Sequence, residues 1–174
     1  TLFANTTGAF NTGVGYEALR DNTCGAYNTA VGGYALRVNT TSICNASFGY
    51  ASMFTNTTGS CNAAFGHAAM YQNTTGAANV AVGFKALFAN TTGLQNVAIG
   101  VCALDANTTA CRNTAVGFHA MGANTTGTYN AAFGNYALKL NTTGNGNTAS
   151  GSYSMNNNTT GTKNTASGTQ SLYK

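Results

Sequence analysis

The chain has 174 residues, and its formal net charge of +4 comes from seven Lys and Arg against three Asp and Glu. Only 6% of the residues are charged, compared with roughly 25% in typical soluble domains, so the chain lacks a basic surface for phosphates and we expect no nucleic-acid partner. Because 43% of the residues are hydrophobic but no run approaches the roughly 18 apolar residues of a membrane helix, we expect neither a disordered chain nor a membrane span in this segment.

One 17-residue unit repeats along the whole chain without insertion or deletion. In each unit an Asn-Thr pair, first seen at Asn5, is followed after six residues by a second Asn, after four more by a Gly, and after four more by Leu or Met. The consensus is N-T-T-G-x-x-N-x-A-[VFI]-G-x-x-A-[LM]-x-x. A period this short is typical of a β-solenoid, in which each repeat forms one coil and successive coils stack.

The parts of the unit favour different local structures. The N-T-T-G segment favours a turn, and the segment that follows the second Asn, such as Ala81-Val82, has the small and β-branched side chains of a packed strand. Asn, Thr and Gly disfavour a helix. We therefore predict an all-β fold, a parallel β-roll of about ten 17-residue coils, each with two short strands and two turns. Residues 1–174 form one repeat solenoid, which we interpret as a window of a longer fibre protein.

Side chains 17 residues apart occupy equivalent positions, which stack about 4.8 Å apart in a solenoid. The charged residues fall at only four of these positions, which we expect to face solvent or a partner. We expect buried Asn columns to form amide ladders and the Leu/Met column to lie in the core. A second core column is predicted from the apolar strand position, which comprises Val14, Val31, Phe48, Phe65, Val82, Ile99, Val116 and Phe133.

The unit Asn113-Thr-Ala-Val-Gly-Phe-His-Ala-Met121 resembles the head repeats of YadA-type trimeric adhesins, which carry N-x-[AV]-[IV]-G. The whole chain is similar to the N-T-A-[VI]-G-Y-x-A-L…N-T-T-G arrays of phage tail-fibre and bacterial surface proteins. This resemblance implies a left-handed parallel β-roll, often trimeric, that is displayed outside the cell or on a virion and has no catalytic residues. Adhesin-head repeats are usually shorter and lack the N-T-T-G segment, so the resemblance does not carry trimerisation over to this chain.

The N-T-T triplet is also the acceptor sequence for N-glycosylation. Turn chemistry explains the triplet without any sugar, but an exposed turn would present a column of acceptors, so covalent N-linked glycans are a second interpretation. The glycosylation candidates are Asn5, Asn39, Asn56, Asn73, Asn90, Asn107, Asn124, Asn141 and Asn158.

Aromatic side chains recur at outward or variable positions, and stacked coils would merge them into apolar stripes that are typical of an interface. We predict that these stripes contact sister chains in a homo-oligomer or filament, or stack against a carbohydrate partner. The alternative is that some of these positions belong to the core. The predicted stripe residues are Tyr16, Tyr34, Tyr50, Phe54, Tyr71, Phe84, Phe88, Phe118 and Tyr136.

Two columns of Thr, which begin at Thr6 and Thr7, resemble the regular arrays of ice-binding surfaces. Cys44 and Cys61 occupy equivalent positions one coil apart, so their predicted Cα separation of about 4.8 Å permits a disulfide. They could equally be two small apolar residues in a column. No C-x-x-C motif occurs, and we predict no metal site.

The titratable residues do not form a catalytic constellation in the sequence. His67 and His119 lie three coils apart, and Asp105 is far from the other carboxylates. We therefore predict no catalytic residues, no enzyme activity and no cofactor apart from glycans. The predicted function is a structural extracellular fibre or filament segment at a cell or virion surface. The alternatives are a receptor-binding adhesin or phage tail-fibre shaft and, less favoured, an ice-binding protein.

Overall fold

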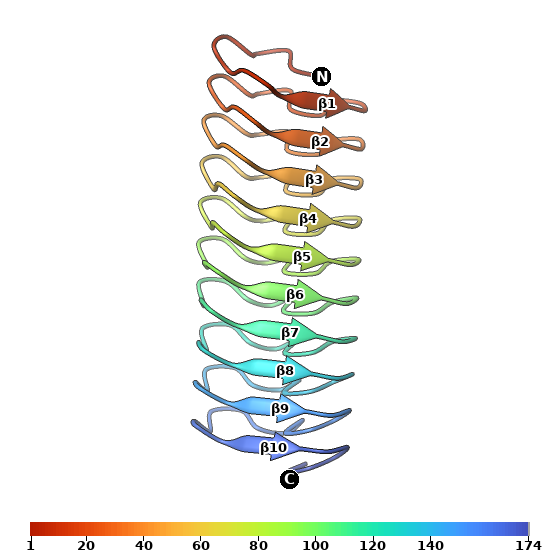
Figure 1. Ribbon diagram of the computed structural model, residues 1–174, viewed down its shortest axis with the longest axis vertical. Helices are drawn as coiled ribbons and strands as arrows, with labels where there is room; N and C mark the ends of the chain where they lie inside the picture. The colour runs from red at the N-terminus through yellow and green to blue at the C-terminus, as the bar shows by residue number, and fades with distance from the viewer. Residues whose placement is uncertain (174) are drawn as a thin grey trace.

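The computed structural model describes residues 1–173, and Lys174, the last of the charged residues, lies outside that range. The chain forms ten parallel strands in one sheet, in chain order, and the coils stack into a rod (Figure 1). No helix occurs in residues 1–173, and none there could cross a membrane. The strands are β1 (Thr12–Val14), β2 (Thr29–Val31), β3 (Ala46–Phe48), β4 (Ala63–Phe65), β5 (Val80–Val82), β6 (Val97–Ile99), β7 (Thr114–Val116), β8 (Ala131–Phe133), β9 (Thr148–Ser150) and β10 (Thr165–Ser167).

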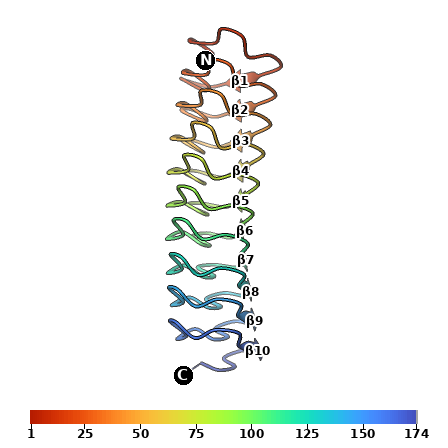
Figure 2. The same ribbon diagram turned by 90° about the vertical axis from the view of Figure 1, so that its left-hand side faces the viewer.

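The register confirms the predicted β-solenoid. Each strand residue pairs with its equivalent in the next coil, as Ala64 does with Ala81 and Phe65 with Val82. The prediction of two strands per coil is wrong, because each coil contains a single three-residue strand. The rest of the coil is a chain of turns on the opposite side of the rod from the sheet (Figure 2).

Left-handed backbone conformations explain why the second half of each coil is not a strand. Three positions per coil have φ near +55°, for example Lys85 at 52°, Leu87 at 53° and Gln95 at 57°. A β-branched side chain is strongly disfavoured in this region. Accordingly, no Val, Ile or Thr has a positive φ among the described residues, and this restriction explains why the core column contains Leu and Met alone.

The core lies between the sheet and the Leu/Met column. Leu87 and Leu104 are fully buried, as are the alanines at the strand centres, such as Ala81 and Ala98. The prediction that the apolar strand position forms a core column is wrong, because Phe65 is 41% exposed and Phe133 is 45% exposed. A three-residue strand points its central side chain inward and the two flanking ones outward. The outward-facing column comprises Val14, Val31, Phe48, Phe65, Val82, Ile99, Val116 and Phe133.

Two buried ladders of asparagine run along the rod beside the apolar core. In the first, Nδ2 of Asn90 donates to Oδ1 of Asn73 at 2.8 Å, and Nδ2 of Asn107 donates to Oδ1 of Asn90 at 2.8 Å. In the second, the backbone N–H and Nδ2 of Asn96 donate to Oδ1 of Asn79 at 2.9 and 3.2 Å. Every buried side-chain nitrogen and oxygen in residues 1–173 has a partner, so the ladders are buried without orphaned polar groups.

The N-T-T-G turn fastens each coil to the next. The backbone N–H groups of Thr74, Thr75 and Gly76 all donate to the carbonyl oxygen of Thr91, at 3.0, 3.1 and 3.2 Å. The Thr74 hydroxyl donates to the same oxygen at 3.0 Å. This segment therefore wraps around one carbonyl of the following coil, which accounts for the recurrence of the motif without any covalent modification.

Candidate functional site

The outer face of the sheet carries no charged side chain. Its outward side chains, the two flanking residues of each strand from Thr12 in β1 to Ser167 in β10, are Val, Ile, Phe, Ala, Thr and Ser. All the charged residues in the described range lie at other corners of the coil. We call this surface, formed by the flanking residues of β1–β10, the sheet face.

A second surface lies along the edge that follows the sheet, where aromatic side chains stack from coil to coil. Phe54, Tyr71 and Phe88 form one column, with ring centroids 5.2 and 5.4 Å apart and interplanar angles of 5° and 13°. Parallel to it, His67 stacks on Tyr50 with the centroids 5.3 Å apart. These rings stabilise neighbouring coils by aromatic contact.

The two aromatic columns border a shallow groove of about 390 Å³, which is lined by Tyr34, Arg37, Tyr50, Ala51, Phe54 and Tyr71. Ala51, the one small residue of this lining, is 5% exposed. Arg37 lies over the rings of Phe54 and Tyr34, 5.3 and 6.0 Å from their centroids. We call this feature the aromatic groove.

The predicted stripe residues therefore all lie at or near the surface, but most of their rings stack against one another. Because the rings of Phe54, Tyr71 and Phe88 stack along the axis, their faces cover each other and their edges point to solvent. Sugars bind aromatic side chains mainly through the ring face. Of the predicted residues, the exposed ones are Tyr16, Tyr50, Phe84 and Phe118, and the half-buried ones are Tyr34, Phe54, Tyr71, Phe88 and Tyr136.

The expectation that the triplet asparagines are exposed is wrong for seven of the nine. These side chains point into the core and use Nδ2, the atom that would carry a glycan, as a ladder donor, and they are Asn39, Asn56, Asn73, Asn90, Asn107, Asn124 and Asn141. Only Asn5 and Asn158, in the first and last coils, are exposed or half-buried. A glycan at an internal position would displace the ladder and the coil packed on it.

The hydroxyl groups of the first Thr column also form hydrogen bonds within the solenoid. The hydroxyl groups of Thr57, Thr74 and Thr91 donate to carbonyl oxygens of the following coil at 3.1, 3.0 and 3.1 Å. Their protons are therefore used inside the solenoid, whereas the second column, which includes Thr58 and Thr92, is exposed.

The cysteines are all free thiols in this structure. Cys44 and Cys61 lie at equivalent, exposed positions with φ of 59° and 60°, and the predicted disulfide between them is not formed. Cys24 is also exposed, and hydrogen bonds with Thr7 and Thr23 hold the pKa of its thiol below the usual value.

The fold brings together three titratable residues that were not predicted to form a site. Ligand atoms of Cys102, Asp105 and His119 all lie within 4.8 Å of one another, and each residue is half-buried. Burial raises the pKa of the Cys102 thiol and that of the Asp105 carboxyl. The signal in the sequence was the period itself, because His119 is equivalent to Cys102 one coil later, and Asp105 is three residues from Cys102.

The remaining carboxylates, which follow β1 near the N-terminal end of the rod, are paired with arginines. Arg37 Nε lies 2.6 Å from Glu17 Oε2, and Arg20 contacts both Glu17 at 3.2 Å and Asp21 at 2.8 Å. The hydrogen bond from Arg37 is the main cause that lowers the pKa of Glu17 below 4.5, and the charges of Arg20 and Arg37 add to it.

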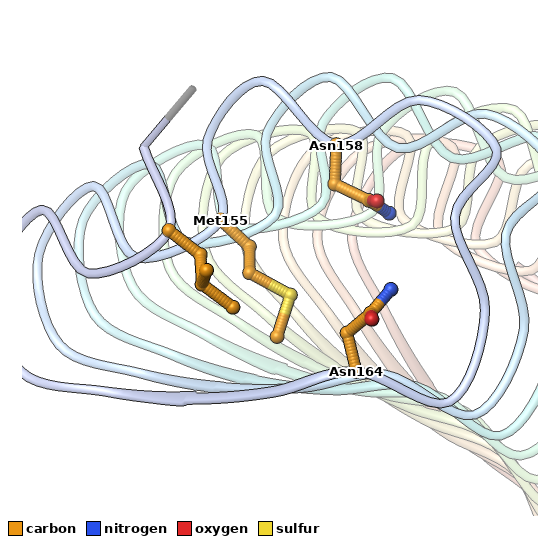
Figure 3. Close-up of a pocket in the computed structure, with 4 residues that line it drawn as sticks. Met155, Asn158 and Asn164 are labelled. Carbon is orange, nitrogen blue, oxygen red and sulfur yellow. The ribbon is translucent and has the colours of Figure 1, made fainter.

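The last coil contains a small opening of about 170 Å³ that is lined by Met155, Asn158, Asn164 and Leu172. Figure 3 shows the side chains of Asn158 and Asn164 pointing toward each other across the interior, beside Met155. These groups continue the core column and the two asparagine ladders, so the opening is the end of the core rather than a separate binding cleft.

Comparisons with protein-family models, with curated proteins and with solved structures found no match to this chain.

Proposed function

We propose that this chain is a non-enzymatic, structural segment of an extracellular fibre, in which the solenoid is a rigid shaft that packs laterally against further copies of itself. The observation that supports the proposal is the uncharged sheet face. Its outward side chains lie on all ten strands, from β1 to β10, and none of them is charged, although charged side chains occur at other exposed positions such as Lys163 and Arg112.

A second copy of the chain is the occupant that fits this face best. Two sheets with the same axial repeat can interdigitate their outward side chains along the whole length, at the spacing of about 10 Å that is common for packed sheets. A charged or irregular partner would match neither the composition nor the period. Lateral packing would also cover Phe48, Phe65 and Phe133, which are half-buried or exposed on a single chain.

The area of the face sets the expected strength of association. Ten strands spaced by about 4.8 Å, each about 10 Å long, give a face on the order of 450 Å². Stable interfaces bury about 800 Å² per partner. One segment should therefore self-associate weakly, and the association should strengthen as coils are added.

The test compares the chain with a tandem duplicate in which residues 5–174 follow Lys174, so that Asn5 falls 17 residues after Asn158 and the register continues. Sedimentation analysis should show weak association of the single segment and an affinity at least about tenfold higher for the duplicate. Phe65→Lys, at the centre of the face, should abolish association. Gln95→Lys should not, because Lys163 already occupies that equivalent position. A duplicate that stays monomeric at its solubility limit would refute the proposal.

The alternative role as a receptor-binding adhesin or tail-fibre shaft has support from the sequence resemblance alone. A carbohydrate platform is less favoured, since the ring faces of the aromatic groove are covered by one another. A dense coat of N-linked glycans is not part of the proposal, because the internal acceptor asparagines are buried.

A further inference from the structure

We infer that Cys102, Asp105 and His119 form a zinc-binding site that clips two neighbouring coils together. Cys102 and Asp105 follow β6 in one coil, and His119 follows β7 in the next (Figure 1). The three ligand atoms already lie within 4.8 Å of one another. Ligand atoms around tetrahedral Zn²⁺ lie roughly 3.3–3.7 Å apart, from bond lengths of about 2.0–2.3 Å, so small side-chain rotations would complete the site.

The combination of ligands favours zinc over other metals. A thiolate excludes Mg²⁺ and Ca²⁺, which prefer oxygen ligands. Thiolate, imidazole and carboxylate together are a donor set that Zn²⁺ uses, and three protein ligands leave a fourth position for water.

A glycine provides the room that the ion would need. Gly122 is equivalent to Asp105 one coil later, and a Cβ there would lie 3.2 Å from Oδ1 of Asp105 and 3.3 Å from Nδ1 of His119. Most other coils carry a long side chain at this position, such as Tyr71, Phe88 and Lys139. The absence of a side chain at Gly122 therefore opens the space directly beside two of the three ligand atoms.

The Asp105 carboxylate forms no ion pair within residues 1–173, unlike the other two carboxylates, although the charges of His119 and Lys85 act on it. Glu17 and Asp21 are both paired with arginines, whereas in residues 1–173 no salt bridge involves Asp105. No described side chain donates a hydrogen bond to it. A divalent ion held with Cys102 and His119 would neutralise this half-buried group.

The experiment titrates Co²⁺, a spectroscopic substitute for Zn²⁺, into the reduced chain and then displaces it with Zn²⁺, while calorimetry gives the stoichiometry. We expect one ion per chain and a thiolate-to-cobalt absorption band. The variants are Cys102→Ala, Asp105→Asn and His119→Gln, whose new residues already occur at equivalent positions as Ala68, Asn156 and Gln170. These variants should therefore keep the fold, which circular dichroism and thermal unfolding would verify.

Loss of the band in Cys102→Ala and a Kd raised by more than about tenfold in Asp105→Asn and His119→Gln would support the site. Gly122→Ala should also weaken binding, since its Cβ intrudes on the ligands. The matched control is Cys61→Ala, which removes an exposed thiol of the Cys44–Cys61 pair and should leave the band unchanged. Loss of the band in the control, or equal binding by all ligand variants, would show adventitious metal and overturn the inference.

Discussion

Replacing Asn90 by alanine tests the asparagine ladder as the source of axial stability, because the structure specifies each hydrogen bond that the change removes. Asn90 Nδ2 donates to Asn73 Oδ1 at 2.8 Å and to the Gly93 carbonyl at 3.2 Å, and Asn90 Oδ1 accepts from Asn107 at 2.8 Å. Three bonds are lost, each contributing about 1 kcal/mol net.

The groups left behind determine the rest of the effect. Gly93 keeps a donor in Asn79 at 2.9 Å, and Asn107 still donates to the Ala110 carbonyl at 3.2 Å. Asn73 Oδ1 has no other donor within residues 1–173, and an unsatisfied buried acceptor adds about 1–3 kcal/mol. We therefore expect Asn90→Ala to lower the free energy of unfolding by about 4–6 kcal/mol.

Thr92→Ala is the matched control, because Thr92 is exposed and its hydroxyl makes no hydrogen bond in the structure. This change destroys the N-T-T acceptor sequence but leaves the ladder intact, so it should shift stability by no more than about 0.5 kcal/mol. Urea unfolding followed by circular dichroism measures both variants, and hydrogen exchange shows whether the loss is centred on the coils around Asn90. Equal destabilisation by the two variants, or an Asn90→Ala effect below about 1 kcal/mol, would refute the reasoning.

Two further predictions concern the left-handed corners and the ion pairs. Leu87→Ile should destabilise the chain by about 2 kcal/mol, since φ at this buried position is 53° and a β-branched side chain is strained there. Leu87→Met, which matches residues at equivalent positions, should change stability by less than about 1 kcal/mol in the same thermal or urea unfolding assay. Equal effects of the two substitutions would contradict the role assigned to the backbone. Glu17→Gln should lower stability at neutral pH, because the folded-state pKa of Glu17 lies below 4.5, so its stabilising contribution is present above 4.5 and is lost as the pH falls through the folded-state pKa. The stability curves of wild type and Glu17→Gln should therefore converge in acid, and a difference that persists there would count against the ion pair as the cause.

The repeat made the fold predictable, because identical units without insertions can stack only with equivalent residues side by side. The register of every strand pair, such as Ala64 with Ala81, follows from the 17-residue spacing in the sequence. Burial of the Leu/Met column was also predictable from its composition. The absence of Val, Ile and Thr at the positions of Lys85, Leu87 and Gln95 was a further signal in the sequence, because it marks the left-handed corners.

The direction of the strand side chains was decided only by the tertiary structure. A three-residue strand such as β4, with Ala64 at its centre, can turn either its central side chain or its two flanking side chains inward. The larger hydrophobic side chain, Phe65, is at a flank, so the sequence favoured burial of the flanks. The interior opposite the Leu/Met column has room for only a small side chain, so the alanines and Ser47 face in and Phe65 faces out. The same stacking buries Asn90 inside an acceptor sequence for glycans and brings His119 beside Cys102 and Asp105. Local sequence specified the coil and its period, whereas the stacking of one coil on the next determined which side chains are buried and which of them meet.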